Sequence, residues 1–424
     1  MTKQNLAYKK ANMSTEAQRL LEKWQPLLES QDFDKIPDDY TAYATAVLLE
    51  NQDRHLTEAA SVDTTGLASY DPIVMNVVRQ AVPSMIAFDL CGVQPMRTPT
   101  GYLFSMIPAY GDPGGDRAGF NEADSAYAGN QAVVQTGSNP YDVANFATFT
   151  VGGPMDTAAA ESATEWAKMG LRLEKQSVAV KTYQLQARVS IEMQQDLKSL
   201  HGIDANSEMT NVLSNELSAE IDRNIVRTMY KTSIPGAEWT TTPGVIDVAA
   251  DFVATADYSS LALSLIDAIE REANAIAVTT RQGKGTFVVV TPRIASIIAI
   301  GVQSAFSSEV RAATSFRYHD ATRVAYLGTL PSGLAVYIDP FVNEATGAGF
   351  TVGFKDPNTT LSAGYFFLPY VPMQLYRGTD SNNYQSTIGV KTRFAQRASV
   401  WVEDGKEGTP NSNPYFRRVT VTGL

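Results

Sequence analysis

The sequence has very few of the residues that build redox, metal or hydrolytic sites. It contains one cysteine, Cys91, among 424 residues, which excludes an intramolecular disulfide framework and fits a reducing compartment. The apolar neighbours of Cys91 predict a buried, unreactive thiol. His55, His201 and His319 lie far apart in three different contexts, so we expect structural or solvent-exposed roles for them.

Excess positive charge and long apolar runs are also missing. The formal net charge of -11 argues against a protein that binds nucleic acid through clustered Lys and Arg, so any contact with DNA should be non-specific. Arg417 and Arg418 lie in an aromatic strand-like stretch, where a role at a subunit contact or at the core edge is expected. No stretch approaches the ~20 apolar residues of a membrane span, and the first residues are polar and Lys-bearing, without the apolar run of a secretion signal. We therefore expect no membrane partner.

The short motifs that could hold a cofactor do not fit their patterns. The glycine cluster at 111–119 lacks dinucleotide spacing, and residues 283–286, GKGT, lack the upstream glycine of a phosphate-binding loop and precede a strand. Asp112, Asp116 and Asp124 miss the EF-hand spacing for calcium. The sequence thus predicts no cofactor, no metal and no enzymatic activity. An α/β enzyme with an unannounced site is the alternative from a different class.

The longest periodic stretch predicts one long helix in residues 191–231. After Asp204, a good N-cap residue, apolar side chains recur every three or four positions for about seven turns, without Pro or Gly. Roughly 27 residues at about 1.5 Å each give a rod of about 40 Å. The stripe consists of Met209, Val212, Leu213, Leu217, Ile221, Ile225 and Met229.

Residues 1–58 are predicted to form two short amphipathic helices whose apolar faces need a partner. They either dock on their own domain as a helical hairpin or contact another protein. Leu-x-Glu triplets occur in this segment, and the last of them is Leu56, Thr57 and Glu58. The small polar run that follows at 59–66 is expected to be accessible to a protease. Apolar residues share one face in each helix: Ala17, Leu20, Leu21, Trp24 and Leu28, with Pro26 ending or bending the helix, and then Tyr40, Tyr43, Val47 and Leu48.

The rest of the chain predicts an α+β fold. Residues 102–190 mix strand-like pieces with turns and return through 181–191, where apolar and polar residues alternate with a period of two. A helix is expected at 261–277 and a buried strand at 286–292, followed by strands and turns to the end of the chain.

Several blocks resemble the major capsid protein of T-even-type tailed bacteriophages. They follow family order along most of the chain and are weak at 111–170 and 233–330. The blocks are AVLLENQ at 46–52, AFDLCGVQPM at 87–96, PTG at 99–101, SIE at 190–192, QDL at 195–197, HG at 201–202, VYID at 336–339, FTVG at 350–353, PYV at 369–371, RG at 377–378, GVKTR at 389–393 and YFRRV at 415–419.

This resemblance implies the HK97-like capsid fold and a division of the chain. The expected parts are a scaffold-facing, cleaved segment (1–58), an N-terminal arm with the start of the peripheral domain (59–100), an extended β-rich loop (101–190), the spine helix (191–235), an axial domain (236–400) and a C-terminal strand returning to the peripheral domain (401–424). Because the chain is shorter than the largest family members, their inserted domain is expected to be reduced or absent.

The resemblance also implies a function and partners. It implies a virion protein, assembled in the host cytoplasm, that forms hexamers, and in one variant also pentamers, of an icosahedral or prolate head. Expected partners are further copies, the vertex protein, the portal, the scaffold, a prohead protease and decoration proteins. The protease would recognise Leu56 and Thr57 and cut between Glu58 and Ala59. A paralogous vertex protein and a bacterial compartment shell protein are the alternatives of the same fold.

Overall fold

The computed structural model describes residues 15–29, 36, 39–62, 85–116, 118–119, 123–129, 150, 152–163, 165–202, 204–251, 258–305, 324–342, 347–356, 362–379, 385–399, 402 and 408–423. The chain divides into two compact units. The larger unit, called the body, comprises residues 1–102, 177–276 and 284–424. The smaller, called the ribbon unit, comprises residues 103–176 and 277–283.

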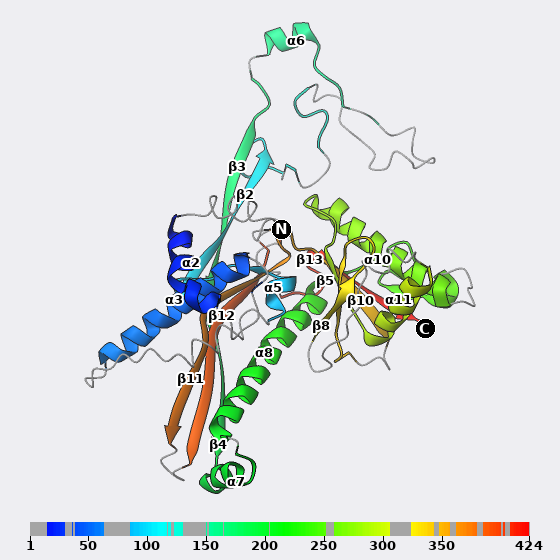
Figure 1. The fold of residues 1–424 in the computed structure, drawn as a ribbon. Coiled ribbons are helices and arrows are strands. Elements are labelled where there is room, and N and C mark those ends of the chain that lie inside the picture. Colours follow the sequence, from blue (N-terminus) through cyan, green and yellow to red (C-terminus); the bar gives the residue numbers. More distant parts are fainter. Residues whose placement is uncertain are drawn as a thin grey trace. The chain divides into compact units, whose positions relative to one another are not determined.

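The body is built along helix α8, Ala205–Thr232, whose 28 residues confirm the long helix that the sequence predicts (Figure 1). The side chain of Asp204 accepts a hydrogen bond from Asn206 N at 3.3 Å, as expected of an N-cap. Most of the predicted stripe is buried, and Leu217, Ile221 and Ile225 are fully so. Val212 is the exception, because its side chain is 52% exposed.

The residues before α8 form a separate helix, α7, Ile191–His201. Its N-cap is Ser190, whose side chain accepts from Met193 N. It ends at Gly202, which has a φ of 67°, a left-handed conformation that glycine adopts without steric cost. The range 191–235 therefore holds two helices.

A four-stranded sheet of described residues packs against α8 in the order β1-β11-β12-β4. Its strands are β1 Gly92–Val93, β11 Tyr365–Thr379, β12 Ser386–Ala398 and β4 Lys181–Val189. Strand β1 runs parallel to β11, and the other two pairings are antiparallel. The predicted two-residue period is confirmed in β4, where odd-numbered residues from 183 are at least partly buried and even-numbered ones are exposed. Strand β4 thus belongs to the body, although its residues fall in the range expected for the extended loop.

A second sheet contains seven strands among the described residues and has the order β5-β13-β10-β7-β9-β8, with β6 also beside β13. Helices α10, Tyr258–Thr280, and α11, Pro292–Ala305, contribute to its apolar core, and the short α9, Val248–Asp251, follows β6. Its strands are β5 Ser233–Pro235, β6 Val245–Asp247, β7 Phe287–Val290, β8 Ala325–Thr329, β9 Ala335–Ile338, β10 Ala348–Gly353 and β13 Asn413–Thr422.

The strands of the four-stranded sheet come from several of the ranges into which the resemblance divides the chain. Strands β11 and β12, within the expected range 236–400, pair with β4 because Phe367, Ile388 and Phe394 are buried in the same apolar core as the α8 stripe. Strand β13, in the range 401–424, pairs with β10 along six residues and also with β5 and β6.

The N-terminal helices, α2 Thr15–Leu28 and α3 Asp39–Val62, pack on the body itself. Trp24 and Leu28 of α2 and Leu48 and Leu49 of α3 are buried in the core that contains the α8 stripe. This packing confirms the helical hairpin docked on its own domain. Pro26 lies inside α2, which ends two residues later. The expected scaffold contact remains a prediction.

Replacement of Leu217 by Pro is expected to prevent folding and assembly. Proline would remove a backbone donor and clash with the preceding turn, at a cost of about 3 kcal/mol or more, and the lost core side chain adds about 2–5 kcal/mol. Circular dichroism and electron microscopy would measure folding and particle formation. Leu217→Met, which conserves volume, serves as the control. Normal shells built by Leu217→Pro would contradict the organising role of α8.

Candidate assembly interface

Two strands of described residues, β2 Thr100–Tyr110 and β3 Met169–Ala179, pair into a ribbon. Gly111 N donates to Lys168 O at 2.8 Å, and Val180 N donates to Pro99 O at 3.2 Å. Both bonds fit one antiparallel register, in which even-numbered residues of β2 lie opposite odd-numbered residues of β3. Directly opposite residues project on the same side of such a pair.

One side of the ribbon exposes large apolar side chains, which we call the ribbon face. It consists of Phe104, Met106, Met169, Leu171 and Leu173, each between 58% and 63% exposed. Complete burial of one such side chain contributes about 1.5–3 kcal/mol, so covering all five contributes on the order of 10 kcal/mol before the cost of association. A two-stranded ribbon is at best marginally stable alone. The ribbon face therefore has the composition of a contact surface.

In β3, the opposite side of the ribbon is more polar than the ribbon face, although it is less exposed. Arg172 and Glu174 form an ion pair of 2.7 Å, at 30% and 28% exposure, while Leu171 and Leu173 between and beside them project outward. In β2, Ile107 is fully buried on this side. Apart from the exposed Lys175, the ribbon face is apolar along this part of β3, while the ion pair lies on the less exposed side, which reverses the usual arrangement of a soluble protein. Sequence reasoning missed the ribbon face because alternation alone does not tell which side is buried.

The turn and the helix beyond the ribbon have local support. The loop after β2 folds back, with Tyr110 N donating to Asp116 O at 2.9 Å. A Cβ on Gly170 would lie 2.7 Å from Pro113 N, so only glycine fits where β3 passes this loop. Helix α6, Thr157–Ser162, is capped by Asp156, whose carboxylate accepts from Thr157 N at 2.8 Å. The glycine cluster is thus a turn, as its spacing indicates.

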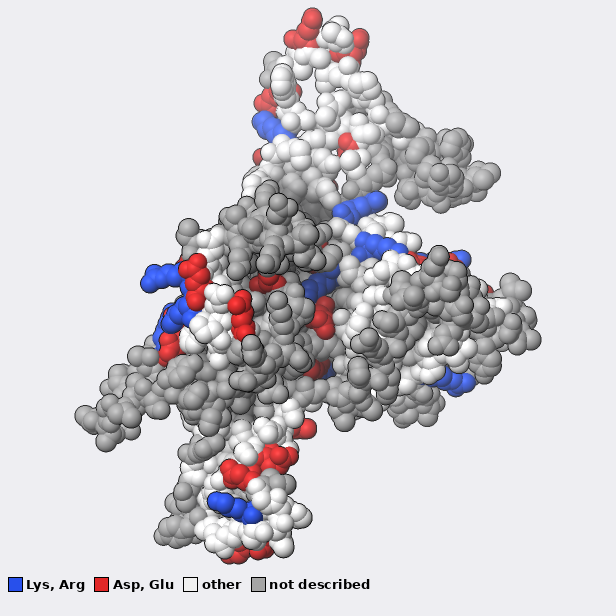
Figure 2. Space-filling model, viewed as in Figure 1, with Lys and Arg blue, Asp and Glu red and all other residues white. Residues whose placement is uncertain are grey.

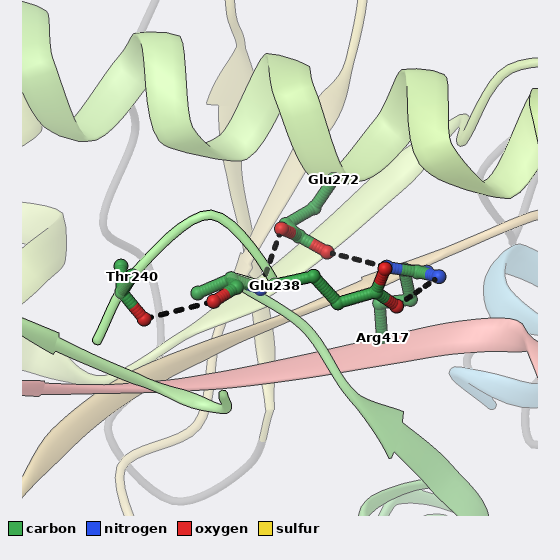
Figure 3. A network of polar contacts seen from close by, with 5 residues as sticks. Glu238, Thr240, Glu272 and Arg417 are labelled. Atoms are coloured by element: carbon green, nitrogen blue, oxygen red, sulfur yellow. Dashed lines mark hydrogen bonds and ion pairs between the residues drawn. The ribbon is translucent and has the colours of Figure 1, made fainter. Parts of the chain in front are cut away.

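The body contains a buried ion cluster that ties β13 to α10 (Figure 3). Glu272 accepts a hydrogen bond from Ala237 N at 2.7 Å and pairs with Arg417 at 3.4 Å, and Arg417 also pairs with Glu238 at 3.0 Å. A Cβ on Gly236 would lie 2.4 Å from the Glu272 carboxylate. Arg417 is therefore a core residue, which agrees with the expected core-edge role. Its charge is paired inside the body, so Arg417 is not free to bind nucleic acid.

A second buried carboxylate joins α8 to the loop after β9. Asp339 has no exposed side-chain surface, and its carboxylate accepts from Arg223 at 2.6 Å, Tyr230 at 2.8 Å and Phe341 N at 3.0 Å. Burial, and then the charge of Asp339, raise the pKa of the Tyr230 hydroxyl above its ordinary value. Arg418 donates to Tyr230 O at 3.1 Å and so engages the same helix.

The predicted cleavage site lies in helix α3. The peptide between Glu58 and Ala59 is in the last two turns of α3, which ends at Val62, and residues 63–66 lie outside the described part of the chain. The side chains of Leu56, Thr57, Glu58 and Ala59 also lie outside it. The run expected to be accessible therefore begins as helix.

The other candidate residues do not converge on a site. His201 is exposed at the end of α7, whereas His319 and the side chain of His55 lie outside the described residues. Where the structure describes side chains, no group of His, Cys, Asp or Glu could hold a metal ion. Cys91 is fully buried, and this burial raises the pKa of its thiol to about 12, so the thiol stays protonated and unreactive as predicted.

The surface charge does not form a basic patch on the face seen in Figure 2. There the described Lys and Arg side chains are scattered among Asp and Glu. Nor is any helix in the described ranges long and apolar enough to cross a membrane. A mixed α and β body together with an outward apolar ribbon is typical of a subunit that assembles with other protein chains.

Comparison with known proteins agrees with this class. The family model of major capsid protein Gp23 matches residues 67–421. The major capsid proteins of Enterobacteria phage T4 and Vibrio phage KVP40 are each 29% identical, over 521 and 517 residues, and the alignments cover 96% of this chain and 98% and 100% of theirs. That of Serratia phage KSP90 is 30% identical over 438 residues, covering 95% of this chain and 97% of its own.

The matched range shows that the chain belongs to the Gp23 family of major capsid proteins. It is a component of the virion capsid and forms the head shell of a tailed bacteriophage. Alignments of 517 and 521 residues exceed the 424 of this chain, so these two relatives carry segments that it lacks.

Solved structures were also compared. The capsid of Myoviridae phage XM1 is 12% identical, with a TM-score of 0.42 over 79% of this chain and 92% of that one. The capsid of cyanophage P-SCSP1u is 10% identical, with a TM-score of 0.40 over 80% and 89%. The family match and the mixed helices and sheets confirm the expected HK97-like α+β fold.

Removal of the Arg417 charge is expected to destabilise the body strongly. Arg417→Met would leave the buried Glu272 carboxylate without its partner, which costs about 3–5 kcal/mol. Denaturant unfolding of the soluble chain would measure the loss. Arg271→Met is the matched control, because Arg271 pairs with Asp267 on the surface and stacks on Trp239, contacts worth about 1 kcal/mol or less. Equal losses for the two variants would contradict the structural role of the cluster.

Proposed function

We propose that the chain builds the head shell through hexameric rings in which the ribbon face of one subunit is covered by the next copy. The single observation that supports this is the ribbon face itself. Its five apolar side chains have 58% to 63% exposure in the isolated chain, against an ion pair on the other side. Exposure of this apolar surface to water is unfavourable. In a shell of identical subunits, a neighbouring copy is available to cover it.

Repeated contact between copies explains how a closed shell forms. A contact between two different surfaces of identical subunits runs head to tail, and it closes into a ring if the rotation between subunits allows it. Each contact can be modest because a shell multiplies them. Pentamers at the vertices would come from the same contact or from a paralogous vertex protein. The portal and the decoration proteins are further proposed partners, and DNA contact is proposed to be non-specific.

We also propose that maturation removes residues 1–58 by a cut between Glu58 and Ala59. The family model begins at residue 67, beyond this peptide, and the cut would fall one turn before the end of α3. Helix ends fray, and proteases bind extended chain, so the last turns of α3 would unwind in the protease. Before the cut, residues 1–58 would also face the scaffold.

Charges placed in the ribbon face are expected to abolish assembly without unfolding the chain. The double variant Phe104→Asp and Leu171→Asp would bury two carboxylates against the next copy, which costs several kcal/mol per contact. Electron microscopy would show no rings or shells, while circular dichroism stays unchanged. Leu200→Asp is the control, because Leu200 is an equally apolar, exposed residue on α7 in the body. Loss of assembly in both, or in neither, would contradict the role of the ribbon face.

Replacement of Glu58 is expected to block processing. In Glu58→Ala the triplet at 56–58 no longer ends in glutamate, so particles formed in infected cells should keep the N-terminal segment. Gel mass and terminal sequencing of purified particles would measure this. Glu22→Ala, which alters an upstream Leu-x-Glu triplet at an exposed position of α2, is the control and should be processed. Processed, DNA-filled heads from Glu58→Ala would contradict the assignment.

A further inference from the structure

We propose that residues 15–58, here called the N-terminal segment, stay bound to the rest of the body after the chain is cut at Glu58. The body carries a binding surface for this segment, and a change in that surface, more than the cut itself, releases it. This inference rests on the proposed cleavage for its biological setting. The binding surface itself is a property of the described contacts.

The first anchor is apolar. Leu48 and Leu49 of α3 are 1% and 0% exposed. Leu48 also lines a small cavity of about 20 Å³. Burial to 1% exposure contributes close to the full transfer energy of the Leu48 side chain. The surface around it, called the α3-binding surface, is formed by Met85, Phe88, Ile221, Phe367, Val371 and Met373.

The second anchor is a polar group that completes an irregular strand. The pairing of β11 with β12 shifts register between Pro369 and Val371. Asn51 Nδ2 donates to Tyr370 O at 2.9 Å and to Met96 O at 2.8 Å. Asn51 is 3% exposed, so departure of the segment would leave both carbonyls without this donor.

The third anchor joins the two helices of the segment to each other. Lys23 of α2 pairs with Glu50 at 2.6 Å and Asp53 at 3.0 Å of α3, and Trp24 Nε1 donates to Glu50 at 3.0 Å. Tyr40 at the start of α3 donates to Val93 O of the body. Helix α2 is thereby joined to α3, and its Glu16 also pairs with Arg97 at 2.5 Å, so the two helices bind as one piece.

All these contacts lie before the proposed cut. The last buried residue with a described side chain is Gln52, six positions before Glu58. Hydrolysis of the bond after Glu58 breaks none of the contacts and removes only the covalent connection, which changes a binding event within one molecule into one between two. Release then requires that α5, Ala87–Leu90, or the irregular part of β11 move.

The test uses the full-length chain with residues 56–59 replaced by the recognition sequence of a site-specific protease. After cutting under native conditions, the two fragments are expected to elute together in size-exclusion chromatography at micromolar concentration. They should separate in denaturant. A segment that elutes alone at once, from a body that remains folded, would overturn the proposal. Because the cut is engineered, this outcome is independent of whether Glu58 is the natural site.

Variants locate the binding energy. Cut chains carrying Leu48→Ala and Asn51→Ala are expected to lose the segment at least ten-fold faster than the cut parent chain. Cut Gln25→Ala is the control and should behave as the parent, because Gln25 is exposed on α2 and, among the described residues, its side chain donates to Glu29 within the segment. Equal rates in all three would overturn the assigned anchors.

A measurement without core variants covers the case in which these substitutions unfold the chain. Backbone amides of residues 44–52 should exchange with deuterium equally slowly before and after the cut, since the buried α3 contacts persist. Loss of protection on cutting alone would overturn the proposal.

Discussion

The burial of one helical stripe is the constraint on which the rest of the body depends. Leu217, Ile221 and Ile225 of α8 are fully buried, and they share a core with β11 and β12 on the one hand and with Phe287 and Phe416 of the seven-stranded sheet on the other. A helix of 28 residues is long enough to contact both sheets. Asp339 and Arg223 fix its later turns by a bond that leaves no exposed carboxylate. Helix α8 therefore positions both sheets through the core that it shares with them.

The sequence allowed prediction of those features that depend on neighbouring residues. Periodicity and the N-cap at Asp204 located α8, and alternation located β4. It did not allow prediction of which strands pair, because β13 meets β10, and β12 meets β4, across long stretches of chain. Val212 belongs to the predicted stripe but is exposed, since position in a helical stripe does not tell where the edge of the stripe meets solvent. The ribbon face was missed for the same reason.

Stability and assembly use opposite chemistry in the two units. In the body, charges such as Arg417 and Glu272 lie inside, with partners, where they cost most if a partner is lost. In the ribbon unit, Phe104 and Leu171 lie outside, where exposure of apolar surface is unfavourable until another chain covers it. In the proposed assembly, the body would fold first and the ribbon would gain most of its burial when another copy covers it.

The N-terminal helices have a double role that follows from their packing. Leu48 and Asn51 complete the core and the hydrogen bonds of the body in the unassembled chain, so they help a new subunit to fold. A core that includes a removable segment is necessarily weaker without it, because the α3-binding surface would face water. If the segment is removed as proposed, that loss would be tolerable only where contacts between copies already hold the body in place. Assembly would then have to precede release, because a subunit without the segment would expose apolar surface and aggregate.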